Sequence, residues 1–137
     1  SPMTPDVLIR ENTEDTFVYN NLIYIDSGAS LSILTNNDSD LNFFRNNLYF
    51  GSVNIDPNTA FQHHSSEIFV DPKLINPGSS DPNDYKLQAD SPAIGKGILI
   101  NGSTNTSNFI QNNGGKDYFG NSVSNSEKPN IGAYNGS

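Results

Sequence analysis

Short apolar segments alternate with polar turns along the first half of the chain. Apolar, β-branched and aromatic residues gather at residues 6–10, 16–25, 31–34 and 42–50, and Asn, Asp, Ser and Gly dominate the stretches between them. Segments of this length and composition favour strands over helices. We therefore predict a strand in each of these four segments, with the second and fourth each interrupted by an Asn pair.

Two of these segments are copies of each other. Residues 19–24 (YNNLIY) return as residues 45–50 (RNNLYF), an offset of 26 residues that also aligns Phe17 with Phe43. A period of roughly 20–50 residues is typical of solenoid proteins, in which each repeat stacks on its neighbour. Since one repeat holds two or three short strands with turns between them, the pattern predicts an all-β fold made of parallel β-helix coils.

Alternation along extended strands sorts the side chains of both copies into two faces. We expect an inward face that is apolar except for Asn20 and Asn46, which would stack at the strand spacing of about 4.8 Å. The other residues expected on this inward face are Val18, Leu22, Phe44 and Leu48. The residues expected on the outward face are Phe17, Tyr19, Ile23, Phe43, Arg45 and Tyr49.

The second half of the chain is rich in turn-forming dipeptides such as Pro-Gly, Asp-Pro and Ser-Pro. These predict loops, and only residues 91–94 suit a single helical turn, with Ser91 as its N-cap. We expect one domain over residues 1–137, with β-helix coils at 6–75 and a loop-rich tail at 76–137. Residues 1–5 are expected to be a cloning remnant or a fragment end.

Composition and charge narrow the function classes. Hydrophobic residues make up only 34% of the chain, but 10% aromatic and 16% charged residues argue against disorder. A net charge of −8 without a basic patch argues against a nucleic-acid partner. No apolar run has the length of a membrane span, and the absence of cysteine rules out disulfides and thiolate metal sites.

Five further motifs follow the repeats in order. They are residues 68–74 (IFVDPKL), 84–87 (DYKL), 90–95 (DSPAIG), 117–121 (DYFGN) and 129–134 (PNIGAY). Together with the doubled Asn-Asn-Leu segments, they resemble the C-terminal coils and tail of bacterial right-handed parallel β-helix proteins of the pectate-lyase-like superfamily. The resemblance covers roughly residues 16–134.

This resemblance implies a terminal piece of a solenoid whose tail finishes the coils. Many proteins of the superfamily act on carbohydrates, so it also implies a secreted, extracellular glycoside hydrolase or polysaccharide lyase. Catalysis in such proteins usually takes place on more central coils, so the catalytic residues are expected mostly outside this chain. The alternative is a non-catalytic module that binds polysaccharide or has a structural and interaction role.

The outward aromatic residues are candidates for binding polysaccharide, because sugars stack on flat side chains with polar groups alongside. The residues expected to form this surface are Phe17, Tyr19, Phe43, Arg45 and Tyr49. A different interpretation of the same stripe is that the tail or another chain covers it, since soluble proteins normally hide contiguous aromatic patches.

Acidic residues are further candidates for a catalytic or metal-binding site. Glu14-Asp15, Asp38 with Asp40, and Asp81 with Asn83 and Asp84 all lie in expected turns, where Asp commonly caps the backbone. Asp81, Asn83 and Asp84 supply the most oxygen ligands, so they are the candidate site for Ca²⁺, although the sequence requires no cofactor. The two histidines, His63 and His64, are adjacent and would point to opposite sides of an extended chain, which favours an exposed loop pair.

The small number of repeats predicts an open end. A solenoid needs about three repeats to bury a continuous core. We therefore expect the N-terminal coil face to be covered by upstream coils or by another subunit.

Overall fold

The computed structural model describes residues 7–9, 16–35, 43–55, 65–100 and 114–137, and these residues form eight short strands and one 3₁₀ helix. The fold is essentially all-β, and every strand pair is parallel. The strands are β1 (Val7–Ile9), β2 (Phe17–Tyr19), β3 (Leu22–Tyr24), β4 (Leu31–Thr35), β5 (Phe43–Arg45), β6 (Leu48–Phe50), β7 (Val53–Ile55) and β8 (Ile68–Phe69). The 3₁₀ helix η1 spans Pro82–Tyr85.

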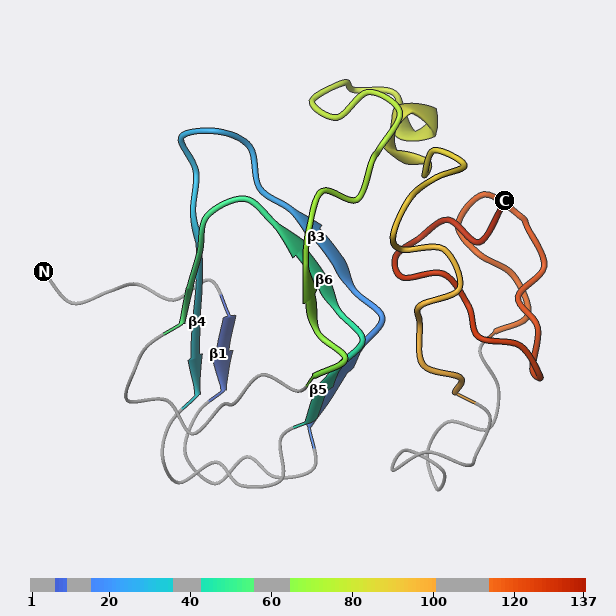
Figure 1. Cartoon of the computed structure of the whole chain (residues 1–137), viewed down its shortest axis with the longest axis horizontal. Coiled ribbons are helices and arrows are strands. Elements are labelled where there is room, and N and C mark those ends of the chain that lie inside the picture. The colour runs from blue at the N-terminus through green and yellow to red at the C-terminus, as the bar shows by residue number, and fades with distance from the viewer. Residues whose placement is uncertain (1–6, 10–15, 36–42, 56–64, 101–113) are drawn as a thin grey trace, which may run out of the picture.

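The strands form three parallel sheets, with the orders β1-β4-β7, β2-β5 and β3-β6-β8. The chain visits the three sheets in turn through β2, β3 and β4, and again through β5, β6 and β7 (Figure 1). Phe17 pairs with Phe43 and Leu22 with Leu48, so β2 pairs with β5 and β3 with β6 in the 26-residue offset of the sequence repeat. The predicted pairing of the two copies is therefore confirmed.

A hydrophobic core lies between the three sheets. Ile33 of β4, Phe44 of β5 and Tyr49 of β6 are each at most 2% exposed and contact one another. The partly buried side chains that pack against them are Val18, Ile23, Leu31 and Val53. Since each sheet contributes one of the three central residues, all three sheets face a common interior.

The prediction that Asn20 and Asn46 stack inside this core is wrong. Both residues have left-handed backbones, with φ of 61° and 53°, and they make the bend between the two strands of each repeat. The following residues stack instead: the Oδ1 atom of Asn47 accepts hydrogen bonds from the backbone N–H and the Nδ2 atom of Asn21, each at 2.9 Å. The bend therefore shifts the alternation by one residue.

This shift also exchanges the faces of the residues after the bend. Ile23 and Tyr49, which were expected outside, pack in the interior. Leu22 and Leu48, which were expected inside, point to the opposite side of the β3-β6-β8 sheet. The strand alternation itself is intact, but its phase is set by the left-handed Asn residue.

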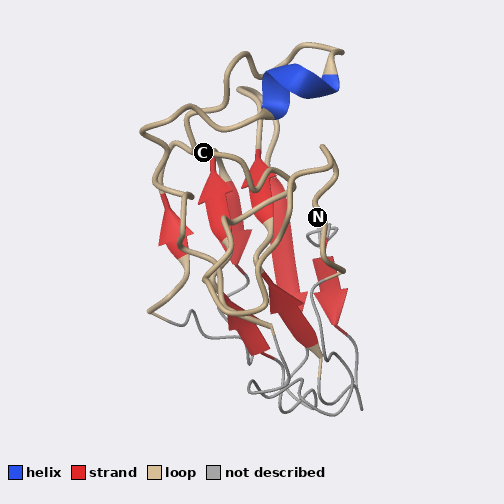
Figure 2. Ribbon diagram, turned by 90° about the vertical axis from the view of Figure 1, so that its right-hand side faces the viewer, coloured by secondary structure: helices blue, strands red, loops and turns tan. Residues whose placement is uncertain are grey.

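The C-terminal tail lies along the outer face of the β3-β6-β8 sheet, beside the strands (Figures 1 and 2). A second core forms there between Leu48 of the sheet and apolar tail residues that are at most 5% exposed. The tail residues buried in this second core are Leu74, Leu87, Ala93 and Ile131. Residues 91–94 form a turn but no helix, with the Ser91 Oγ atom accepting a hydrogen bond from the Ala93 N–H at 3.2 Å. The one helix of the described residues, η1, lies instead in a segment for which loops were predicted.

The two bend residues hold the tail in place. The side chain of Asn20 accepts a hydrogen bond from the N–H of Ile98 at 2.7 Å and donates one to its carbonyl at 2.9 Å. Asn46 donates to the Lys96 carbonyl at 2.8 Å. The first Asn of each pair thus connects the sheet to the tail, while the second Asn belongs to the interior stack.

Candidate functional site

A cluster of aromatic rings and one guanidinium occupies the outer face of the β2-β5 sheet. The rings of Phe17 and Phe43 stack almost parallel, with centroids 5.3 Å apart and an interplanar angle of 8°. Tyr19 meets Phe17 edge-on at 5.8 Å, and the Arg45 guanidinium lies 5.5 Å from the centroid of Phe43. We call these four residues the platform; each of them is half-buried.

The repeat builds the platform because register and alternation agree before the bend. Phe17 lies beside Phe43, and Tyr19 lies beside Arg45, in a parallel pair of strands. Val18 and Phe44, which alternate with them, point into the interior core and anchor the strands there. Side chains on a sheet held from its other face lose little conformational entropy on binding a ligand.

The polar groups of the platform have defined states. Partial burial raises the pKa of Tyr19, although the positive charge of Arg45 opposes this shift. The Tyr19 phenol is therefore neutral at physiological pH and can donate a hydrogen bond. Arg45 uses one Nη1 hydrogen bond, of 2.9 Å, to the Phe44 carbonyl, and this contact orients the guanidinium beside the rings. The platform thus combines apolar ring faces with hydrogen-bond donors.

Tyr49 does not belong to this surface, contrary to the prediction from alternation. It is 1% exposed, and its hydroxyl donates a hydrogen bond of 3.0 Å to the Glu67 carboxylate. The left-handed bend at Asn46 turns the side chain of Tyr49 inward. Its ring stacks on Phe69 at 5.0 Å, in the direction of the last strand of the sheet.

The candidate Ca²⁺ ligands form a local turn. Asp81 caps η1, and its Oδ1 atom accepts hydrogen bonds from the N–H of Asn83 at 2.9 Å and from its Nδ2 atom at 3.0 Å. These bonds lower the pKa of Asp81. Asp84 follows in the same turn and accepts a long hydrogen bond of 3.4 Å from Asn76. Among the described residues no group of three or more His, Cys, Asp or Glu side chains comes together, so Ca²⁺ binding stays a prediction.

The remaining sequence candidates lie outside the described residues. They are Glu14, Asp15, Asp38, Asp40, His63 and His64.

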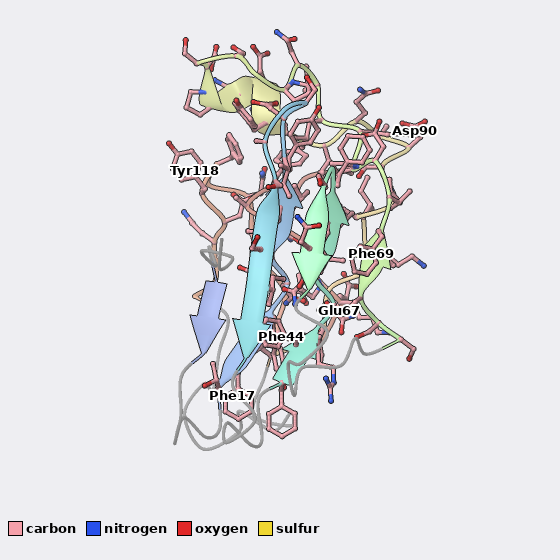
Figure 3. All side chains as sticks on the ribbon, turned by 90° about the vertical axis from the view of Figure 1, so that its left-hand side faces the viewer. Phe17, Phe44, Glu67, Phe69, Asp90 and Tyr118 are labelled. Carbon is pink, nitrogen blue, oxygen red and sulfur yellow. The ribbon has the colours of Figure 1, made fainter. Side chains whose placement is uncertain are left out.

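A buried carboxylate, Glu67, was not found from the sequence. It is 7% exposed, lies above Phe44 in the view of Figure 3, and accepts hydrogen bonds from the Asn47 N–H at 2.7 Å and from the Tyr49 hydroxyl at 3.0 Å. Burial raises its pKa, and the hydrogen bonds from Asn47 and Tyr49 oppose the shift. Glu67 extends the hydrogen-bonded series from Asn21 through Asn47, which is a structural role. The sequence contains one indication that Glu67 is buried, because this residue directly precedes the apolar residues 68–70.

An aromatic cluster in the tail was also missed. It includes Tyr85, which is 41% exposed, and Tyr118, which is 72% exposed. From the sequence, both residues were assigned only to tail motifs. Their proximity could not be predicted, because it depends on the fold of segments more than 30 residues apart.

No protein-family model matches the chain, and comparisons with curated proteins and with solved structures found no similar protein. Over the described residues, the structure contains no helix with the length and apolar character needed to cross a membrane.

Proposed function

We propose that this chain is the terminal part of a secreted parallel β-helix protein that acts on polysaccharide, and that the platform binds the polysaccharide chain. The fold supports this proposal through its three parallel sheets, visited in the same order twice and facing one interior. The proposed coils are right-handed, as in the superfamily that the sequence resembles.

The observation that carries the binding role is the parallel stack of Phe17 on Phe43. The apolar faces of pyranose rings pack against aromatic faces, while their hydroxyls need donors and acceptors nearby. Tyr19 and Arg45 flank the stack and supply such donors. A surface that follows the stacking direction of the strands suits a linear polymer better than a small compact ligand.

Catalysis is assigned to residues mostly outside this chain. A glycoside hydrolase uses two carboxyl groups facing one substrate bond. Two carboxylates in the described part of the chain are instead used locally: Glu67 is buried against Asn47, and Asp81 caps η1. The proposed parent protein is a glycoside hydrolase or a polysaccharide lyase.

The alternative is a non-catalytic module, and it rests on the same platform. Two assays on the whole chain separate these functions: release of reducing or unsaturated sugar ends, and retardation in native gels containing polysaccharide. Turnover by this chain alone would favour the enzyme. Retardation without turnover that is abolished in Tyr19→Ala or Phe43→Ala would favour the binding module. The absence of both turnover and retardation would contradict a saccharide-related role.

We further propose that another coil or subunit adjoins β2 and β3. The end of the interior stack at Asn21 supports this part of the proposal. Asn47 is completely buried, whereas its counterpart Asn21 is exposed. In this series a side-chain oxygen accepts a hydrogen bond from the N–H of the preceding member: Asn47 accepts from Asn21, and Glu67 accepts from Asn47. Upstream coils or a second subunit would complete this pattern at Asn21.

A further inference from the structure

The tail carries an open cleft of about 370 Å³ that is separate from the platform. Three aromatic side chains, Tyr85, Tyr118 and Phe119, form its walls. The other residues lining it are Ser80, Pro82 and Ala133. Tyr118 projects from the tail below η1, at the edge of the molecule (Figure 3). At 72% it is the most exposed of the large apolar and aromatic side chains in the described part of the chain.

Tyr118 is exposed, but its backbone is firmly held. The preceding residue, Asp117, accepts hydrogen bonds from the N–H groups of Phe119 and Asn121 at 2.8 Å and of Asn135 at 2.6 Å. The Nδ2 atom of Asn121 adds a fourth at 2.9 Å. Although partial burial acts in the opposite direction, these bonds lower the pKa of Asp117, so the carboxylate is charged and the turn persists at neutral pH.

The other two walls are also fixed. The Tyr85 hydroxyl donates a hydrogen bond to the Ser79 carbonyl at 2.8 Å and accepts one from the Gly78 N–H at 3.2 Å. Phe119 meets Tyr118 edge-on at 5.0 Å and Tyr134 edge-on at 5.6 Å. The Lys86 ammonium lies over Phe119, 5.0 Å from the ring centroid. These contacts preorganise the aromatic walls, which reduces the entropic cost of binding.

A second cleft, of about 380 Å³, adjoins the first and shares Tyr118 and Ala133 with it. Its lining is mostly apolar, but it includes the polar side chains of Lys116, Asp117 and Asn135. Tyr118 therefore lies between the aromatic walls of the first cleft and the polar residues of the second. A ligand at this position meets an apolar surface on one side and hydrogen-bonding groups on the other.

We propose that the Tyr118 cleft is a second saccharide-binding subsite, which takes a pyranose ring with its apolar face on the tyrosine. A pyranose ring has an apolar face for the aromatic walls and hydroxyls for polar side chains such as Lys116, whereas a wholly aliphatic ligand would use only the walls. The choice of ligand class rests on the proposed function, but the cleft and its rigidity do not. Two subsites on one chain would strengthen the binding of a long polymer that reaches both.

The test is an NMR titration of the isotopically labelled whole chain with cellohexaose, xylohexaose and mannohexaose, following the aromatic resonances. We expect at least one of these sugars to shift the Tyr118, Tyr85 and Phe119 signals together. Tyr118→Ala should weaken that binding roughly tenfold, the effect of losing one ring contact of about 1.4 kcal/mol. Tyr118→Phe should retain it. Ile75→Ala, at a 52% exposed aliphatic residue outside the cleft, is the matched control and should bind as the unaltered chain does.

The outcomes separate this inference from the proposed function. Shifts confined to Phe17, Tyr19 and Phe43 would overturn the second subsite and leave the platform in place. Shifts confined to the Tyr118 cleft would support the subsite and contradict the platform, while no shift with any of the three sugars would overturn both. If lauric acid shifts the cleft signals and the sugars do not, the cleft binds an apolar ligand and the saccharide assignment is wrong.

Discussion

The side-chain oxygen of Asn47 accepts two hydrogen bonds from Asn21, one from its backbone and one from its side chain, each at 2.9 Å. The two residues occupy equivalent positions of the repeat and lie one strand spacing apart. Asn47 also donates to the Val18 carbonyl at 2.8 Å. The Asn47 side chain therefore satisfies the hydrogen-bonding capacity of two backbone groups at the bend, where the strand pairing is interrupted. The asparagines stack because these backbone groups need side-chain partners there.

Replacing Asn47 should destabilise the fold strongly. Asn47→Ala leaves the Val18 carbonyl and the Asn21 N–H without their partners, and we expect unfolding free energy to fall by about 2–4 kcal/mol. Asn21→Ala is the matched control because its side chain is exposed, and its cost should be below about 1 kcal/mol. Urea denaturation followed by circular dichroism measures both values. Equal losses in the two variants would contradict the role assigned to the buried Asn.

Glu67 should make stability depend on pH. Because burial raises its folded-state pKa above the unfolded value, the unfolded chain releases this proton first as the pH rises. The contribution of Glu67 to stability is therefore greatest below its usual pKa of 4.5 and declines until the pH passes the folded-state pKa.

Glu67→Gln tests this dependence, since the amide retains an oxygen for the Asn47 N–H and a polar group for the Tyr49 hydroxyl. We expect the variant to gain stability relative to the unaltered chain as the pH rises from the usual pKa of 4.5 through the raised folded-state pKa of Glu67. Chemical denaturation at a series of pH values measures the difference. An identical pH profile for both proteins would mean that Glu67 has no shifted titration.

The packing of the tail on the sheet can be tested at two glycines with positive φ. Gly132, at φ of 100°, faces Leu22 so closely that an added Cβ would lie 2.9 Å from the leucine Cβ. Gly120, at φ of 86°, has nothing within 4 Å of that position. Both Gly→Ala variants incur the strain of a left-handed backbone, about 1–2 kcal/mol, but only Gly132→Ala also displaces the tail.

Hydrogen exchange should distinguish these glycine variants. In Gly132→Ala we expect faster exchange at Ile131 and Gly132, whose N–H groups bond to the Ala93 and Asn20 carbonyls. Gly120→Ala should leave those amides protected. Protection in both variants would show that the contact between Gly132 and Leu22 does not hold the tail.

Much of the fold follows from the repeat, because strands with the same local sequence pair in the register of the repeat, as Phe17 does with Phe43. The phase of the alternation after the bend does not follow from the repeat. Two identical asparagines are adjacent in the sequence, and only the backbone conformation shows that Asn20 is the left-handed one. This is why Tyr49 was assigned to the outer surface. The position of the tail depends on contacts such as Asn20 with Ile98, across 78 residues, and local patterns carry no information about them.

Four of the five residues predicted for the sugar-binding surface form the platform, because these four precede the bend, where alternation and register agree. Glu67 and the Tyr118 cleft escaped prediction because each is defined by neighbours from other segments. The identity of a single acidic residue or tyrosine in a turn-rich sequence does not indicate which residues will surround it in the fold.

Calorimetric titration of the whole chain with soluble polysaccharides tests the central claim, saccharide binding by the platform, most directly. We expect measurable binding to at least one polymer, and a loss of roughly a hundredfold in Phe17→Ala/Phe43→Ala, in which two ring contacts of about 1.4 kcal/mol each are removed. Phe69→Ala, at a 52% exposed ring outside the platform, should bind like the unaltered chain. Unchanged affinity in the folded double variant would contradict the platform as the binding surface.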